Sequence, residues 1–391
     1  MKQPIALLIA LLLAGCLSSC AGSGKPGATI VPAPAPTISS GFPYQQGWLG
    51  ADGAYSVPLG NRRSLWFFDD SFIGAADQTS RLQPTRFIHN SIGISNCNAA
   101  CTFQYFWSGM STGTPGAVFI APGSDWFWPM DGFVYKGKLY VALMQMHAAG
   151  SGAFGFAYSG AQLATVSNYT APPPQWSITY QPLNTGGTAV PGVSIVVQQG
   201  PGGNPDPADP QGANYAYFFT AAGSPPCLAL LRIPLADLDH LARPGNSDWQ
   251  YRSTSGAWET WPDTATTLPG NNAPVINPGA TEMTVRWHNT TRQWLAVYPL
   301  GLRKEAHYSV SASLTGVWGP SESLYPYPEL QPSNPNFTPN LFCYAVKEHV
   351  ELEAAGQLVF TYACNSTVED EILKNMNLYH PIMVRQQLPA R

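Results

Sequence analysis

The sequence is poor in charged residues and in helical patterns. Only 11% of its 391 residues are charged, and the lysines and arginines are scattered instead of forming a basic block. With a formal net charge of −4, this pattern argues against a nucleic-acid partner. One short segment, 367–375, predicts a helix, because acidic residues stand in its first turns and Lys374 near its end.

Several common catalytic motifs are also missing. There is no Gly-x-Ser-x-Gly elbow, no phosphate-binding loop and no His-Glu-x-x-His zinc helix. Residues 150–155 (Gly-Ser-Gly-Ala-Phe-Gly) match the dinucleotide fingerprint in letters, but no βαβ pattern surrounds them. We interpret them as a glycine loop and expect no cofactor.

Glycine, proline and aromatic residues are abundant, which favours strands and turns. The chain has 37 Gly and 37 Pro, and 12% of its residues are aromatic. Five apolar runs recur about every 65–80 residues, the length of a four-stranded blade. These runs are 65–68, 139–143, 215–219, 294–298 and 358–362, and turns such as Gly60-Asn61 and Lys136-Gly137 precede four of them. We predict an all-β fold, a five-bladed β-propeller over residues 42–391, with the run 378–388 closing the ring by joining the first blade.

The N-terminus is typical of an exported lipoprotein. Lys2 precedes the apolar run 5–14, which is too short to span a bilayer, and residues 13–16 (Leu-Ala-Gly-Cys) resemble a lipobox ending at Cys16. Residues 1–16 would be the signal peptide and 17–41, rich in Pro, Ala, Gly and Ser, a tether. We expect a lipid-anchored monomer in the bacterial cell envelope, periplasmic or at the surface. The alternative is a secretory signal ending near Ala21.

Seven cysteines in an exported chain suggest disulfides. Cys16 would carry lipid, which leaves six. Cys97 and Cys101 could close a small loop, and Cys343 and Cys364 lie on strands that we predict to pair. The partners of Cys20 and Cys227 stay open.

The chemistry would lie where the innermost strands of the blades begin, because these strands run beside the axis and their residues converge. Asp52, Asp131 and Glu282 occupy such positions, and His349 follows in the last blade. Cleavage of a glycosidic bond needs an acid for the leaving oxygen and a second carboxylate to activate water or attack carbon. Clustered carboxylates raise one another's pKa and keep one protonated. A glycan substrate follows from this pattern.

We predict Asp52 as base or nucleophile, Glu282 as acid, and Asp131 as the residue that orients them and tunes their pKa. The predicted substrate-binding residues are Asp70, Trp126, Trp128, Arg286, His349 and Asn90. Trp126 and Trp128 would share one face of a strand as a sugar platform, with Phe127 opposite. A structural calcium ion on the axis would suit this fold, although no ligand spacing indicates a metal site.

One segment carries a family resemblance. Residues 51–59 (Ala-Asp-Gly-Ala-Tyr-Ser-Val-Pro-Leu) and 65–74 (Leu-Trp-Phe-Phe-Asp-Asp-Ser-Phe-Ile-Gly) resemble the opening of the bacterial propeller family called domain of unknown function 4185. Similar pieces follow at 131–135, 281–287, 314–318, 344–349 and 379–381. That family includes endo-D-arabinanases of glycoside hydrolase family 183.

The resemblance implies an inverting hydrolase of a furanose-containing, D-arabinan-like polysaccharide. Two departures accompany it. The family's Gly-Asp-Thr is Asp69-Asp70-Ser71 here, and the third blade lacks an acidic residue at Val190-Pro191-Gly192. In related propellers of glycoside hydrolase family 43 that blade supplies the acid, so Glu282 would replace it. The alternative is a non-catalytic surface lipoprotein that binds glycan or protein.

Overall fold

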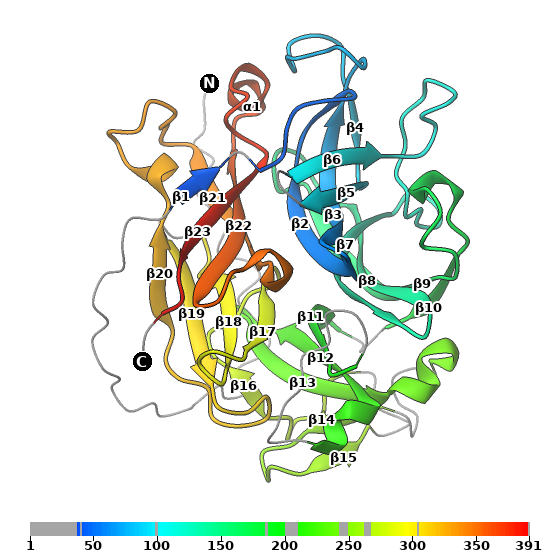
Figure 1. Ribbon diagram of the computed structural model, residues 1–391, viewed down its shortest axis with the longest axis vertical. Helices are drawn as coiled ribbons and strands as arrows, with labels where there is room; N and C mark the ends of the chain where they lie inside the picture. The colour runs from blue at the N-terminus through cyan, green and yellow to red at the C-terminus, as the bar shows by residue number, and fades with distance from the viewer. Residues whose placement is uncertain are drawn as a thin grey trace.

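The computed structural model describes residues 37–39, 41–97, 101–183, 187–199, 210–241, 249–261, 267–302 and 305–389. Within them, five antiparallel sheets form a ring around a central axis (Figure 1), which confirms the all-β, five-bladed β-propeller. Their single α-helix, α1 (Glu369–Lys374), lies inside the predicted helical segment. No helix in the described ranges is both long and apolar enough to cross a membrane.

The first two blades are built from consecutive hairpins. The first contains β2 (Trp48–Gly60), β3 (Arg63–Ile73), β5 (Ser91–Cys97) and β6 (Cys101–Phe106), with β4 (Arg86–Ile88) also on β3. The second contains β7 (Trp126–Tyr135), β8 (Lys138–Ala148), β9 (Phe156–Val166) and β10 (Ile178–Pro182), with the 3-10 turn η1 (Pro173–Gln175) before β10. Lys136 and Gly137, the predicted turn between β7 and β8, both have positive φ, as a tight hairpin requires.

The other three blades follow the same plan. The third contains β11 (Val190–Val197), β12 (Tyr215–Ala222), β13 (Cys227–Pro234), β14 (Gln250–Arg252), β15 (Trp258–Thr260) and β16 (Pro274–Ile276), with η2 (Pro210–Asn214) and η3 (Leu235–His240). The fourth contains β17 (Thr284–His288), β18 (Gln293–Pro299), β19 (Glu305–Ser311) and β20 (Glu322–Pro326), followed by η4 (Pro328–Leu330). The fifth contains β21 (Leu341–Glu348), β22 (Gln357–Ser366), β23 (Pro381–Gln387) and β1 (Thr37–Ser39), with η5 (Val350–Leu352).

The ring is closed by the N-terminal strand and not by the C-terminal one. The prediction that 378–388 joins the first blade was wrong, because β23 pairs with its chain neighbour β22 in the fifth blade. β1, from the segment predicted as tether, then pairs with β23 as the outermost strand of that blade. The last blade thus combines both ends of the described chain and covers an edge that β23 would otherwise expose.

Arg81 fastens the first blade to the fifth. It is almost completely buried, and its guanidinium donates to the carbonyls of Leu49, Ile372, Leu378 and Tyr379 at 2.7–3.1 Å. Four carbonyls from two blades thus satisfy a buried charge without a carboxylate partner among these contacts. Two disulfides add local links: Cys97–Cys101 joins β5 to β6, and Cys343–Cys364 joins β21 to β22. Both fit the predicted pairings, and Cys227 is disulfide-bonded as well.

The inner strands of four blades are bulged at the positions where the sequence repeat was recognised. The register shifts lie at 53–55 in β2, 129–132 in β7, 191–194 in β11 and 344–347 in β21. Positive φ angles at Ala54, Gly192 and Ala345 accompany three of them, and a Cβ on Gly192 would lie 2.5 Å from that of Ala142. A bulge bends a strand and redirects its side chains, so the repeat marks where the inner strands bend near the axis.

Neighbouring inner strands are joined by one repeated hydrogen bond. A side chain on one strand accepts from a backbone N–H of the next: Ile195 N to Asp131, Val285 N to Ser194 and Glu348 N to Thr284, all at 2.8–2.9 Å. Asp131 is therefore the first of a series of links that join the second blade to the third, the third to the fourth and the fourth to the fifth.

Candidate active site

Four carboxylates gather near one end of the axis. Asp52 lies at the bulge of β2, Asp69 and Asp70 lie on the neighbouring β3, and Glu282 lies two residues before β17. The close approach of β2 and β3 depends on Gly53, which has a φ of +78° and whose Cβ would stand 2.8 Å from Asp69 Oδ2. The sequence Asp-Gly in β2 therefore does two things: it presents one carboxylate and leaves room for a second.

The floor of the site contains a buried ammonium group. Lys347 from β21 is fully buried, and its Nζ lies 3.1 Å from Glu282 Oε1 and 4.4 Å from the centre of the Tyr55 ring. Tyr55 in turn donates to the carbonyl of Val193 at 2.8 Å, and Met283 N donates to its hydroxyl at 3.3 Å. Side chains from the first, fourth and fifth blades thus meet here, with backbone from the third.

The carboxylates outnumber the cation that faces them, and burial adds to the resulting repulsion. Burial raises the pKa of Asp52 well above its usual range, and the charges of Asp70 and Glu282 raise it further, while a hydrogen bond donated by the Tyr344 hydroxyl opposes them. The pKa of Asp69 is raised by burial and by Asp52, with Lys347 acting in the opposite direction. Clustered acids of this kind retain a proton near neutral pH. Asp69 is buried, whereas Asp52, Asp70 and Glu282 are partly exposed as residues. Asp52 Oδ1 is itself buried and accepts no hydrogen bond from the described residues, and Oδ2 accepts from Tyr344.

Aromatic rings border this cluster on the side of the second blade. Asp70 accepts from His89 Nδ1 at 2.8 Å and from Trp128 Nε1 at 3.0 Å. The His89 imidazole stacks on Trp126 with ring centres 4.4 Å apart and planes 13° apart, and Trp126 lies edge to face with Trp128. Both tryptophans are partly exposed, and Phe127 is buried on the other face of β7. This arrangement suits stacking against a sugar ring.

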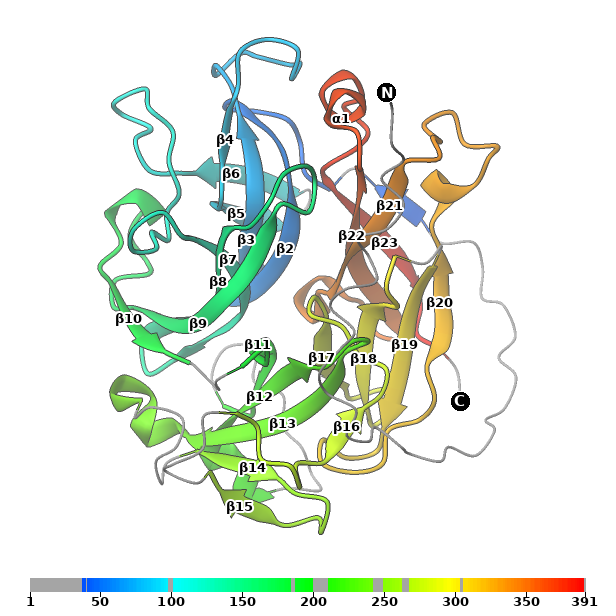
Figure 2. The same cartoon turned by 180° about the vertical axis from the view of Figure 1, so that it is seen from behind.

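A loop from the second blade reaches the fifth across this end of the axis. Residues 149–155 join β8 to β9 and form the predicted glycine loop, which Figure 2 shows extending toward the fifth blade. At its tip Phe154, 54% exposed, packs 5.5 Å from Phe342, which stacks on Tyr344 at 5.4 Å. Because the Tyr344 hydroxyl donates a hydrogen bond to Asp52, this row of rings lies directly beside the carboxylates.

Asp131 and Arg286 are used inside the protein. Arg286 donates from Nη2 to Oδ1 and from Nη1 to Oδ2 of Asp131, both at 2.9 Å, and Gly132 N, Ser194 Oγ and Ile195 N also donate to this carboxylate. The Asp131 side chain is fully buried and that of Arg286 nearly so. We had expected Asp131 to orient the catalytic carboxylates and Arg286 to contact substrate. These contacts instead support a structural role, in which the pair joins the second blade to the fourth.

Asn90 and His349 are likewise satisfied by protein groups. Asn90 is fully buried, donates to the carbonyls of Phe119 and Phe127, and accepts from the N–H groups of Val118 and Phe119. The His349 ring, also fully buried, is bonded to Ser56 and Thr361. Burial, with the charges of Arg286 and Lys347, lowers the pKa of His349 well below its usual range, so it is neutral. The geometry assigns both residues to the scaffold instead of to substrate binding.

Three residues of the cluster had not been predicted: Asp69, Lys347 and Tyr344. Asp69 was visible in the Asp69-Asp70 pair, but strand alternation alone does not bring both carboxylates to one site. Lys347 lies near the end of the inner strand β21, which begins at Leu341. The bulge at 344–347 is what brings Tyr344 to Asp52 and Lys347 to Glu282.

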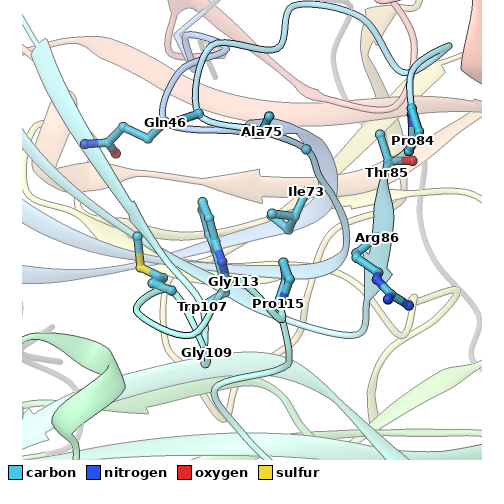
Figure 3. Close-up of a pocket in the computed structure, with 13 residues that line it drawn as sticks. Gln46, Ile73, Ala75, Pro84, Thr85, Arg86, Trp107, Gly109, Gly113 and Pro115 are labelled. Carbon is cyan, nitrogen blue, oxygen red and sulfur yellow. The ribbon is translucent and has the colours of Figure 1, made fainter.

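A separate cavity of about 580 Å³ lies at the outer loops of the first blade (Figure 3). Its lining includes Ile73, Arg86, Trp107, Met110 and Pro115, and none of the four clustered carboxylates. The side chains of Trp107 and Ile73 point into it, and Arg86 stands at one side. Most of its lining surface is apolar, so this cavity lacks the acid pair that glycosidic cleavage requires.

The fold and the site together define a class: a five-bladed β-propeller with clustered carboxylates and an aromatic border at one end of its axis. A family model described as "Domain of unknown function (DUF5005)" matches residues 40–387, and the chain belongs to this family. The resemblance to the 4185 family and its arabinanases is not part of this match and stays an expectation. No curated protein matches the chain.

Solved structures share the fold at low sequence identity. A provisionally assigned hydrolase from Bacteroides ovatus is 16% identical over 88% of this chain and 86% of its own, with a TM-score of 0.66. An exo-β-1,3-galactanase from Phanerochaete chrysosporium is 12% identical over 90% of this chain and 64% of its own (TM-score 0.46). A GH43_1 enzyme from Xanthomonas citri is 12% identical over 90% and 91% (TM-score 0.44). At these identities a likeness concerns the fold only.

Proposed function

We propose that this protein is a glycoside hydrolase whose reaction takes place at the carboxylate cluster. The observation that carries the proposal is the gathering of Asp52 with the partly exposed Asp70 and Glu282, next to aromatic rings. Glycosidic cleavage needs an acid and a second carboxyl group in one site. The raised pKa of Asp52 favours it as the acid, and Glu282, paired with Lys347, is our candidate for the second. The Bacteroides ovatus protein of similar fold, itself provisionally assigned as a hydrolase, agrees with this proposal.

We assign the two roles in the reverse of the order that the sequence suggested. Asp52 carries the proton, because burial and neighbouring charge raise its pKa, and it donates this proton to the leaving oxygen. Glu282 is paired with Lys347 and acts as the carboxylate that activates water. Attack by water in a single step gives inversion at the anomeric carbon. Asp70, fixed by His89 and Trp128, and the rings of Trp126 and Trp128 hold the sugar.

The proposed substrate is a furanose-containing polysaccharide, D-arabinan first. Support comes from the sequence pieces that resemble endo-D-arabinanases, one of which contains Asp52. The test is incubation of the protein with D-arabinan, L-arabinan and xylan, with measurement of new reducing ends and with NMR of the first product's anomer. Sugar release from D-arabinan supports the assignment. Binding of a glycan without release of sugar from any of them contradicts hydrolysis and favours the non-catalytic lipoprotein.

We also propose that the protein is monomeric and anchored to the cell envelope through Cys16. The lipobox pattern at residues 13–16 supports the anchor, and these residues lie outside the described part of the chain. Metabolic labelling with a clickable palmitate analogue tests it. Label on the wild type that is lost in Cys16→Ala supports the anchor, whereas equal labelling of both, or of neither, rejects it.

A further inference from the structure

A second group of ionisable side chains lies where the inner strands of the fourth and fifth blades end. His288 is the last residue of β17, Glu348 is the last residue of β21, and Glu353 follows η5. A nitrogen or oxygen ligand atom from each of the three lies within 4.8 Å of the other two. The carboxylate cluster of the candidate active site contains none of them.

The group is buried and carries more acid than base. The side chains of His288, Glu348 and Glu353 are 5%, 0% and 9% exposed. His288 Nε2 lies 2.5 Å from Glu348 Oε1, and its Nδ1 lies 3.7 Å from Glu353 Oε2. Arg286, whose charge also acts on Glu348, is already bonded through both terminal nitrogens to Asp131. One imidazole is therefore left between two carboxyl groups.

One oxygen in this group is buried without an N–H or hydroxyl donor. Glu348 Oε2 accepts no hydrogen bond from such a donor among the described residues, and the carboxyl group of Glu353 lies within hydrogen-bond reach of Glu348, so two carboxyl groups face each other where a cation could bind. An unpaired buried carboxylate oxygen is costly, because burial removes its water without replacement. Because Oε1 of the same carboxyl group is hydrogen-bonded to His288, Oε2 also lies within this group.

We propose that His288, Glu348 and Glu353 form a binding site for one divalent transition-metal ion, with Zn²⁺ as the favoured ion. One imidazole and two carboxylates are ligands that Zn²⁺ accepts, whereas Ca²⁺ and Mg²⁺ prefer oxygen alone. Two ligand atoms at the usual zinc distances stand about 3.3 Å apart in a tetrahedral site. His288 and Glu348 would therefore exchange their hydrogen bond for metal bonds and separate slightly. The ion would join the ends of β17 and β21.

The test uses the full-length, tag-free protein, stripped with a chelator and titrated calorimetrically with Zn²⁺, Mn²⁺, Ca²⁺ and Mg²⁺. Glu353→Gln is the main variant, because glutamine can still accept the hydrogen bond that Val359 N donates to Glu353 Oε1. Glu369→Gln, at an exposed position, is the control. We expect one equivalent of Zn²⁺ to bind the wild type and the control, and to bind Glu353→Gln at least tenfold more weakly. Zn²⁺ should also raise the melting temperature of the wild type and of Glu369→Gln more than that of Glu353→Gln.

Absence of stoichiometric Zn²⁺ binding to the wild type overturns the proposal, as does undiminished binding to Glu353→Gln. If that variant does not fold, X-ray absorption of the zinc-loaded wild type decides. Nitrogen and oxygen ligands with one imidazole support the site, and a sulfur ligand contradicts it. Neither readout depends on glycoside hydrolysis, so the two proposals can fail separately.

Discussion

Lys347→Met removes the ammonium that faces Glu282 while keeping most of the packing of the side chain. Truncating one member of a buried ion pair costs about 3–5 kcal/mol, because the other charge loses its partner. Glu282 is 23% exposed, so water recovers part of this loss, and we expect a decrease of about 2–3 kcal/mol in the free energy of unfolding. Loss of the ammonium–ring contact with Tyr55 adds a smaller part.

The decrease in the free energy of unfolding caused by Lys347→Met should depend on pH. Lys347 lowers the pKa of Asp69 against the larger effect of burial, so its removal raises that pKa further. A carboxyl group with a raised folded-state pKa destabilises the fold most above that pKa, and this penalty declines to zero as the pH falls to the unfolded-state pKa. The difference between variant and wild type should therefore be larger at pH 8 than at pH 5.

Urea unfolding of both proteins at pH 8 and pH 5 measures these differences. Lys138→Met is the matched control, because Lys138 forms a similar ion pair with Asp239 at 2.6 Å on the exposed surface, and we expect it to cost less than about 1 kcal/mol. A cost for Lys347→Met no larger than that of the control, or one that grows toward pH 5, would refute the assignment of Lys347 as the counter-charge of the cluster.

Three further predictions concern the ring, the aromatic border and the acid. Arg81→Met leaves four buried carbonyls without their donor and should lower stability by about 3 kcal/mol in urea unfolding; a loss below 1 kcal/mol contradicts its role in closure. Trp126→Ala should raise KM about tenfold and change kcat little, and an effect on kcat alone contradicts sugar stacking. Activity should fall as pH rises through the pKa of Asp52, since its proton is then lost; pH–rate profiles decide, and a fall only toward acid pH contradicts an acid role.

Much of the fold could be predicted because its signals are local. The five apolar runs are the second strands β3, β8, β12, β18 and β22, each a buried strand beside the inner one. Closure of the ring was mispredicted because it depends on pairing between distant parts of the chain. β23 pairs with its chain neighbour β22, and β1, from the other end of the chain, completes the same blade.

The site was predicted in part, and for a physical reason. Asp52 and Glu282 were found because the sequence repeat marks the inner strands: Asp52 lies at a bulge within β2, and Glu282 lies two residues before β17. The same repeat marks Asp131, yet its contacts tie blades together, and a sequence pattern does not distinguish a carboxylate that accepts from Arg286 and Ile195 N from one that faces substrate. Tyr344 and Lys347 reach the cluster through a bulge, which shifts the alternation that sequence reading assumes.

The most direct measurement compares sugar release from D-arabinan by the wild type, Asp52→Asn, Glu282→Gln and the exposed control Asp77→Asn. Loss of an acid or base in glycosidic cleavage should reduce kcat/KM by about 10²–10⁴-fold. We predict losses of this size in the first two variants and none in the control, with circular dichroism showing that all four proteins are folded. Equal rates in Asp52→Asn and wild type would contradict catalysis by this carboxylate cluster.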